Sequence, residues 1–132
     1  MLVFNNYLVD KIDFSLNENL EQGTTYKIKP IFSRNIEKKD ERYYVNLTFK
    51  LVSDTEEELP IRLFISMIGI FTLTDEENKE QLINYDSIMI MFPYLRAIVS
   101  TVTSSANIPN ILLPTINMAA VMKIQEDREE PI

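Results

Sequence analysis

Residues 87–122 read SIMIMFPYLRAIVSTVTSSANIPNILLPTINMAAVM and carry more apolar side chains than one small domain can bury internally. Up to residue 102 the spacing is helical, and an apolar stripe recurs every three or four positions, at Tyr85, Ile88, Phe92, Leu95, Val99 and Val102. We expect this stripe to pack on a sheet. A second stripe lies on an adjacent side of the helix and consists of Met91, Tyr94, Ile98 and Thr101. A helix that is apolar on two sides usually has two partners, so the surplus predicts oligomerisation or the capture of other polypeptides.

Prolines mark the ends of this helix. Pro93 removes a backbone donor, so the helix either kinks there or begins near it, and Asn107 with Pro109 ends it. The next loop, residues 108–116, is dense in large aliphatic side chains, which is unusual on a surface unless something packs on them. Asn117 suits the N-cap of a short second helix that carries Met118, Val121 and Met122.

Upstream of the helix, residues 2–16 have the alternation of a long strand. A bulge is expected near Asp10. One two-residue register holds Leu2, Phe4, Leu8, Ile12, Phe14 and Leu16, and the other holds Asn5, Lys11, Asp13 and Ser15. Residues 17–25 follow, with the composition of a turn and enough length to cross to another place in the sheet.

Three more strands are predicted after this connection. The second, residues 26–36, contains Pro30, which lacks a ladder donor and therefore indicates a sheet edge or a bulge. Residues 43–51 alternate cleanly between apolar and polar positions, which is typical of a half-buried strand. Residues 61–73 are apolar on both faces, so we expect that neither face is left to water.

The order of four strands followed by two helices predicts an α+β fold, a four-stranded antiparallel sheet with two C-terminal helices on one face. A length of 132 residues suits one domain, residues 1–132. Residues 126–132 are acidic and are expected to form a flexible tail.

Composition restricts the function. The chain has no cysteine and no histidine, which removes thiolate nucleophiles, a Ser-His-acid site and the commonest metal ligands, so we expect neither an enzyme nor a bound cofactor or metal. A net charge of −7 argues against nucleic-acid binding. The N-terminus lacks the apolar block of an export signal, and residues 61–73 are too short to span a bilayer as a helix, so we expect a cytoplasmic protein without membrane insertion.

Three segments together resemble the SecB family of protein-export chaperones. They are GIFTL at residues 69–73, MFPYLRAIVSTV at 91–102 and PNILLPTINMAAVM at 109–122, and the likeness covers almost the whole chain. Pro114, the second proline of the loop, lies one place earlier than is usual in the family. No segment is decisive alone, but their order and spacing are specific.

The resemblance implies an ATP-independent chaperone that holds unfolded polypeptides in hydrophobic grooves and keeps them competent for export or assembly. It also implies a homotetramer, a dimer of dimers built through the first strand and the long helix. The oligomer interface would then include Met91, Tyr94, Ile98 and Thr101. The client-binding groove would be lined by Ile28, Phe32, Ile111, Leu112, Leu113, Ile116, Met118, Val121 and Met122.

One departure concerns the delivery partner. Export-linked members present acidic residues on the outer sheet face to the basic tail of the SecA motor, and at the aligned positions this chain has Lys11, Ser15 and Phe64. The acidic patch is therefore missing in its usual form. SecB-like chaperones dedicated to the antitoxin of a toxin–antitoxin module are a second possibility.

Two alternatives from other classes stay open at this point. A pocket between sheet and helices would suit a carrier of a small hydrophobic ligand. The apolar surplus would also suit a structural oligomer that has no client.

Overall fold

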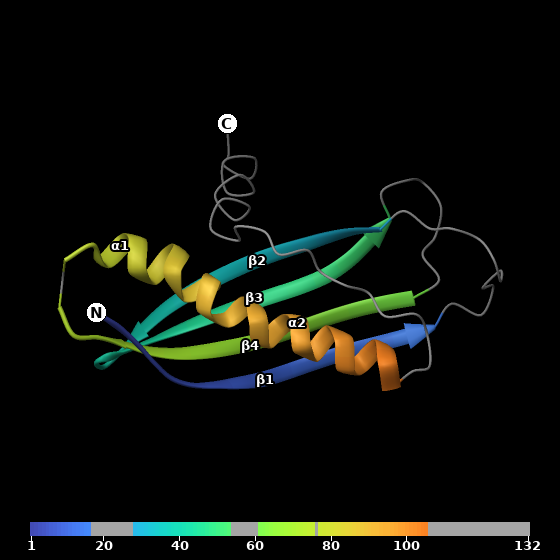
Figure 1. The fold of residues 1–132 in the computed structure, drawn as a ribbon, viewed down its shortest axis with the longest axis horizontal. Helices are drawn as coiled ribbons and strands as arrows, with labels where there is room; N and C mark the ends of the chain where they lie inside the picture. The colour runs from blue at the N-terminus through green and yellow to red at the C-terminus, as the bar shows by residue number, and fades with distance from the viewer. Residues whose placement is uncertain (17–27, 54–60, 76, 106–132) are drawn as a thin grey trace.

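The computed structural model describes residues 1–16, 28–53, 61–75 and 77–105, and Figure 1 shows its arrangement. Four strands form an antiparallel sheet, and one continuous helical stretch crosses one of its faces diagonally. The strands are β1 (Leu2–Leu16), β2 (Ile28–Lys39), β3 (Arg42–Ser53) and β4 (Ile61–Leu73). The helical stretch comprises α1 (Lys79–Gln81), the π-helical turn η1 (Leu82–Asp86) and α2 (Ser87–Ser105). The α+β prediction is confirmed, while the predicted second helix lies outside the described residues.

The strand order is β1-β4-β3-β2, with antiparallel pairing at each step. Strands β1 and β2 are consecutive in the sequence but occupy opposite edges of the sheet. The edge position of β2 explains how it accommodates Pro30, because an edge strand can lack one ladder donor. The central strands β3 and β4 carry most of the core.

Strand β1 contains two register shifts against β4, one between Phe4 and Asn6 and one between Val9 and Lys11. The second shift confirms the bulge expected at Asp10. The first is not predicted, and it corrects the placement of Leu8 in one register with Phe4 and Ile12, because one extra residue moves every following side chain to the other face. Between the two bulges, therefore, Tyr7 and Val9 face the helix.

The core lies between the helix and what we call the inner face of the sheet. Because side chains alternate along each strand, β3 and β4 supply every second residue to this face. The core residues that are at most 1% exposed come from β3, β4 and α2 and are Val45, Leu47, Phe49, Leu63, Ile65, Met67, Phe71, Ile88, Met91, Leu95 and Val99. Complete burial of one such side chain stabilises the fold by about 1.5–3 kcal/mol. Of the stripe predicted to face the sheet, Ile88, Phe92, Leu95 and Val99 are buried and Val102 packs against the core. Tyr85 is only half-buried, with the Arg34 guanidinium over its ring.

The helix begins well before Pro93, which lies exposed inside α2. The residues from Lys79 to Ser105 form one stretch of 27 that is long and apolar enough to cross a membrane by length and composition. A single stretch of this kind is weak evidence for a membrane span, because the core helix of a soluble protein passes the same test. Here the residues Ile88, Leu95 and Val99 are fully buried against the sheet, which identifies a core helix.

The start of β1 is fastened to the end of β4. The backbone N–H of Thr74 donates to the carbonyl oxygen of Met1 at 2.9 Å. The Met1 ammonium lies 2.7 Å from Oδ2 of Asp75, and this hydrogen bond lowers the pKa of the Asp75 carboxyl. These contacts fix the beginning of β1, an edge strand that pairs with another strand on only one side.

Candidate functional site

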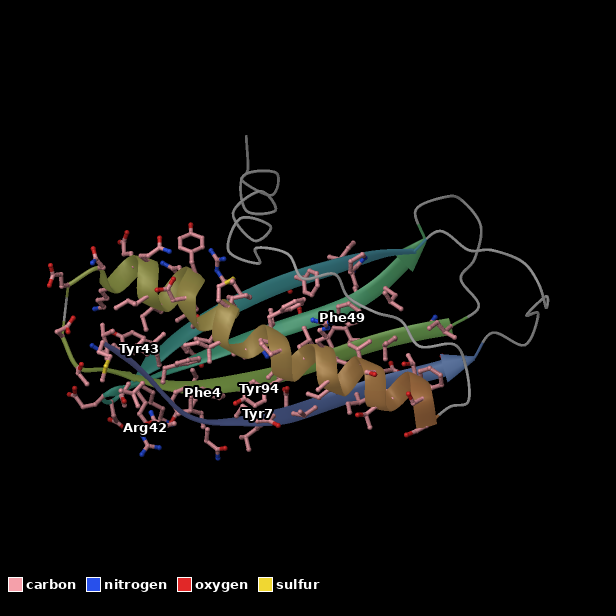
Figure 2. All side chains as sticks on the ribbon, viewed as in Figure 1. Phe4, Tyr7, Arg42, Tyr43, Phe49 and Tyr94 are labelled. Carbon is pink, nitrogen blue, oxygen red and sulfur yellow. The ribbon has the colours of Figure 1, made fainter. Side chains whose placement is uncertain are left out.

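Four aromatic side chains from three elements meet where α2 crosses β1. Phe4 and Tyr7 come from β1, Phe71 from β4 and Tyr94 from α2, and Figure 2 labels three of them, Phe4, Tyr7 and Tyr94. The Tyr94 ring centroid lies 4.8 Å from that of Tyr7 and 5.5 Å from that of Phe4, and Phe4 lies 5.2 Å from Phe71. Such tilted pairs contribute about 0.5–1.5 kcal/mol each beyond area burial. The cluster therefore holds the edge strand against the helix.

Beside this cluster lies an apolar hollow, the β1–α2 hollow, with a volume of about 400 Å³. Strand β1 and helix α2 supply all of its lining, which is Tyr7, Val9, Ile12, Tyr94, Ala97, Ile98, Thr101 and Val102. The first bulge of β1 creates this lining, because it turns Tyr7 and Val9 toward the helix.

The hollow is incompletely covered. Val9 is 37% exposed, Ile12 48% and Tyr94 39%, so three large apolar groups of the lining remain in contact with water. Burying such a side chain completely is worth about 1.5–3 kcal/mol. A surface that leaves several of them open at one place is typical of an interaction site.

Of the predicted interface residues, the structure brings three together at the β1–α2 hollow, namely Tyr94, Ile98 and Thr101. The prediction of Met91 as an interface residue is wrong, because Met91 is fully buried inside the protomer and cannot offer an exposed contact. A Cβ built on Gly69 would come within 2.7 Å of the Met91 Sδ, so the missing side chain of Gly69 makes room for Met91 on the sheet.

The β1 members Tyr7, Val9 and Ile12 were missing from the sequence-based set. Tyr7 and Val9 fall out of the simple alternation that the sequence predicts, and only the unpredicted bulge brings them inward. The tyrosine in a strand otherwise rich in aliphatic residues is the one local signal that could have been used.

Most of the predicted client groove lies outside the described residues, namely Ile111, Leu112, Leu113, Ile116, Met118, Val121 and Met122. Ile28 is the first residue of β2 and pairs with Ser53. The prediction of Phe32 as a groove residue is wrong, because Phe32 is only 2% exposed and packs in the core. Its ring lies 5.5 Å from that of Phe49 and 6.2 Å from that of Phe92.

The chemistry of the hollow is that of binding. Its lining contains no acidic or basic side chain, and its polar side-chain groups are the hydroxyls of Tyr7, Tyr94 and Thr101. Within residues 1–16, 28–53, 61–75 and 77–105, no group of three or more carboxylates could hold a metal ion. Apolar surface with a few hydroxyls suits another polypeptide chain.

We call the opposite side of the sheet the outer face. Lys11, Ser15 and Phe64, which stand where an acidic patch was expected, all lie there, since they pair with Ser66, Arg62 and Asp13 in the same register. The Lys11 ammonium lies 5.6 Å from the centroid of the Phe64 ring, which is a cation–π contact.

Comparison with known proteins agrees with this fold. The family model SecB, described as preprotein translocase subunit SecB, matches residues 21–129. An uncharacterized protein of Methanocaldococcus jannaschii is 32% identical over 137 residues, covering 98% of this chain and 88% of its own. The protein-export protein SecB of Neisseria meningitidis serogroup B is 31% identical over 114 residues, covering 83% of this chain and 77% of its own.

Among solved structures, the chain resembles a SecB-like chaperone of Mycobacterium tuberculosis, which was solved in complex with a peptide from the HigA1 antitoxin. The TM-score is 0.71 at 10% sequence identity, and the match covers 87% of this chain and 90% of that chain. At this identity the likeness shows a shared fold.

Proposed function

Since this chain belongs to the SecB family, we propose that it is an ATP-independent molecular chaperone, formed by a single domain over residues 1–132, that binds unfolded polypeptides and keeps them competent for export or assembly. Binding, not catalysis, is its activity. The family consists of chaperones without enzymatic activity, and we place this member in the cytoplasm, where its clients are synthesised.

The observation that carries the proposal is the exposure of large apolar side chains along β1 and α2. Leu8, Val9 and Ile12 on β1 and Met89 and Tyr94 on α2 are each more than a third exposed. Apolar burial needs no particular sequence in the partner, so such a surface suits both a second subunit and clients that share only their unfolded state. The net charge of −7 keeps such a surface soluble through mutual repulsion.

The β1–α2 hollow is assigned to self-assembly in this proposal. It lies on the edge strand and the long helix, the two elements through which a dimer of dimers would form, and Tyr94, Ile98 and Thr101 face it together. A partner subunit would cover the three exposed lining residues. The client grooves would then use Ile28 and the residues that the family resemblance assigns to them further along the chain, namely Ile111, Leu112, Leu113, Ile116, Met118, Val121 and Met122.

The test is suppression of aggregation. An unfolded client, such as a chemically denatured enzyme, is diluted into buffer with and without the purified chain, and light scattering is followed without nucleotide. We expect scattering to fall at a near-stoichiometric ratio and added ATP to have no effect. Absence of any effect across several clients would refute the proposal.

A second candidate is a chaperone dedicated to one antitoxin. It is favoured by the outer face, where Lys11, Ser15 and Phe64 replace the acidic patch that serves SecA. It is also supported by the antitoxin peptide bound to the M. tuberculosis protein of the same fold. Broad client binding together with affinity for a SecA tail peptide would favour general export, whereas a single high-affinity client would favour the dedicated role.

The two competitors from other classes give different results in the same experiments. A carrier of a small hydrophobic ligand would be a monomer that copurifies with its ligand. A purely structural oligomer would have the mass of a tetramer and would leave client aggregation unchanged.

A further inference from the structure

The outer face of the sheet has a regular grid of side chains, because the antiparallel registers align positions across all four strands. One row across β2, β3, β4 and β1 is Ser33, Thr48, Ser66 and Lys11. The next row in the same direction is Ile31, Lys50, Phe64 and Asp13. Neighbours within a row are about 4.5–5.5 Å apart at Cβ, so these side chains form one continuous surface.

Positive charge gathers around Phe64. Lys50 is its direct neighbour on β3, Arg62 lies two residues before it on β4, and Lys11 lies over its ring. Asp13, the direct neighbour on β1, is the only carboxylate among the described residues that adjoin Phe64 in this grid. Three cations against one anion is a local reversal in a chain whose net charge is −7.

The three cations lie at the surface. Lys11, Lys50 and Arg62 are all exposed, and no ion pair within 4.0 Å joins any of them to a carboxylate of the described segments. The cation–π contact to Phe64 limits the positions that the Lys11 side chain samples, so less side-chain entropy is lost on binding.

The same patch offers apolar surface and hydroxyl groups. Phe64 is half-buried, and Ile68 lies four residues further along β4 on the same face, beside the exposed Leu8. The Ser33 and Thr48 hydroxyls are hydrogen-bonded to each other across β2 and β3. Carboxylates accept hydrogen bonds from ammonium, guanidinium and hydroxyl groups, and an apolar residue between them would pack on Phe64.

We infer that the outer face around Phe64 binds an acidic, extended segment of a partner protein, with carboxylates at Lys11, Lys50 and Arg62 and an apolar side chain on Phe64. This patch, the cationic patch, lies on the sheet face opposite the helix and is separate from the β1–α2 hollow. It therefore does not depend on the assignment of the hollow to assembly.

The experiment measures fluorescence anisotropy with three labelled peptides of equal length that share a central leucine and carry glutamate, lysine or glutamine around it. We expect the full chain to bind the glutamate peptide best, and its affinity to fall as salt is raised. The double variant Lys50→Glu with Arg62→Glu should weaken that affinity about tenfold, since two attractive contacts become repulsive. Asp13→Lys should strengthen it.

The matched control is the double variant Lys39→Glu with Arg42→Glu, at the far end of the same sheet. It changes the net charge by the same amount and concerns residues that are also exposed. Equal loss of binding in both double variants, or equal binding of all three peptides, would overturn the inference. Client aggregation assays should respond alike to both double variants, which separates a failure here from a failure of the chaperone proposal.

Discussion

The rings of Tyr7 on β1 and Tyr94 on α2 lie 4.8 Å apart at an interplanar angle of 45°, and both side chains line the β1–α2 hollow. This pair joins the edge strand to the helix at the place where the protein exposes apolar surface. It therefore bears on the stability of the protomer and on its assembly.

Removal of either ring should destabilise the protein. Tyr94→Ala loses the contacts with Tyr7 and Phe4 and should lower the free energy of unfolding by about 1–2 kcal/mol. A double-mutant cycle with Tyr7→Ala, measured by urea denaturation, should give a coupling energy of about 0.5–1.5 kcal/mol. Met89→Ala, which removes an exposed side chain of α2 outside the cluster, is the control and should change stability little. Strict additivity of the two tyrosine variants would show that the rings do not interact.

A methyl group at position 69 should also be costly. Its carbon would lie 2.7 Å from the Met91 Sδ and 2.8 Å from Cε2 of Phe71, both too close, so we expect Gly69→Ala to destabilise the fold by about 1–3 kcal/mol. Met91→Ala alone leaves a cavity and should cost about 2–5 kcal/mol.

The two variants should compensate each other, because the added methyl group occupies part of the space that Met91 leaves. Thermal or urea denaturation of Gly69→Ala with Met91→Ala should thus give a loss smaller than the sum of the single losses. If the two losses of stability add fully, the missing side chain of Gly69 does not make room for Met91.

On the outer face, Asn46 connects two strands through its side-chain amide. Its Nδ2 donates to the Ser66 Oγ at 2.9 Å and to the Met67 carbonyl oxygen at 3.0 Å. Asn46→Ala leaves the buried Ser66 hydroxyl with one partner fewer and should cost about 1–3 kcal/mol. Its exposed cross-strand neighbour Asn35 gives the matched control, since Asn35→Ala should change the unfolding free energy by less than about 0.5 kcal/mol. If both variants change the free energy of unfolding equally, these hydrogen bonds do not contribute to stability.

The sequence predicts the elements well because each has a strong local period. Strand β3 alternates without interruption, and the stripe of Ile88, Leu95 and Val99 has the spacing of a helix face. Strand β4 has buried apolar residues at every second position from Ile61 to Met67, although its other face is also partly apolar. The order of the strands could not be predicted in the same way, because pairing between distant segments is not encoded in the period of any one of them.

The candidate site was predicted only in part, for two physical reasons. The simple alternation predicted for β1 runs through a bulge for which Tyr7 is the one local signal, so it groups Leu8 with Phe4 on the face where Tyr7 and Val9 lie. Met91 was separated from the sheet-facing stripe, although it lies three residues after Ile88 and four before Leu95. The space for it comes from Gly69 on another element, a non-local property.

Assembly through the β1–α2 hollow gives the sharpest test of the proposed function, because β1 offers a matched pair of exposed apolar residues. Ile12 is 48% exposed and lines the hollow, whereas Leu8 is 53% exposed and lies on the outer face. A buried, unpaired carboxylate is strongly unfavourable, so Ile12→Asp should dissociate the oligomer if a partner subunit covers the hollow. Native mass spectrometry or light scattering should then show a smaller particle for Ile12→Asp and an unchanged mass for Leu8→Asp. Because both positions are exposed in the protomer, circular dichroism should show that both variants remain folded. An unchanged mass for Ile12→Asp in an oligomeric protein would place the subunit interface elsewhere and leave the hollow to clients.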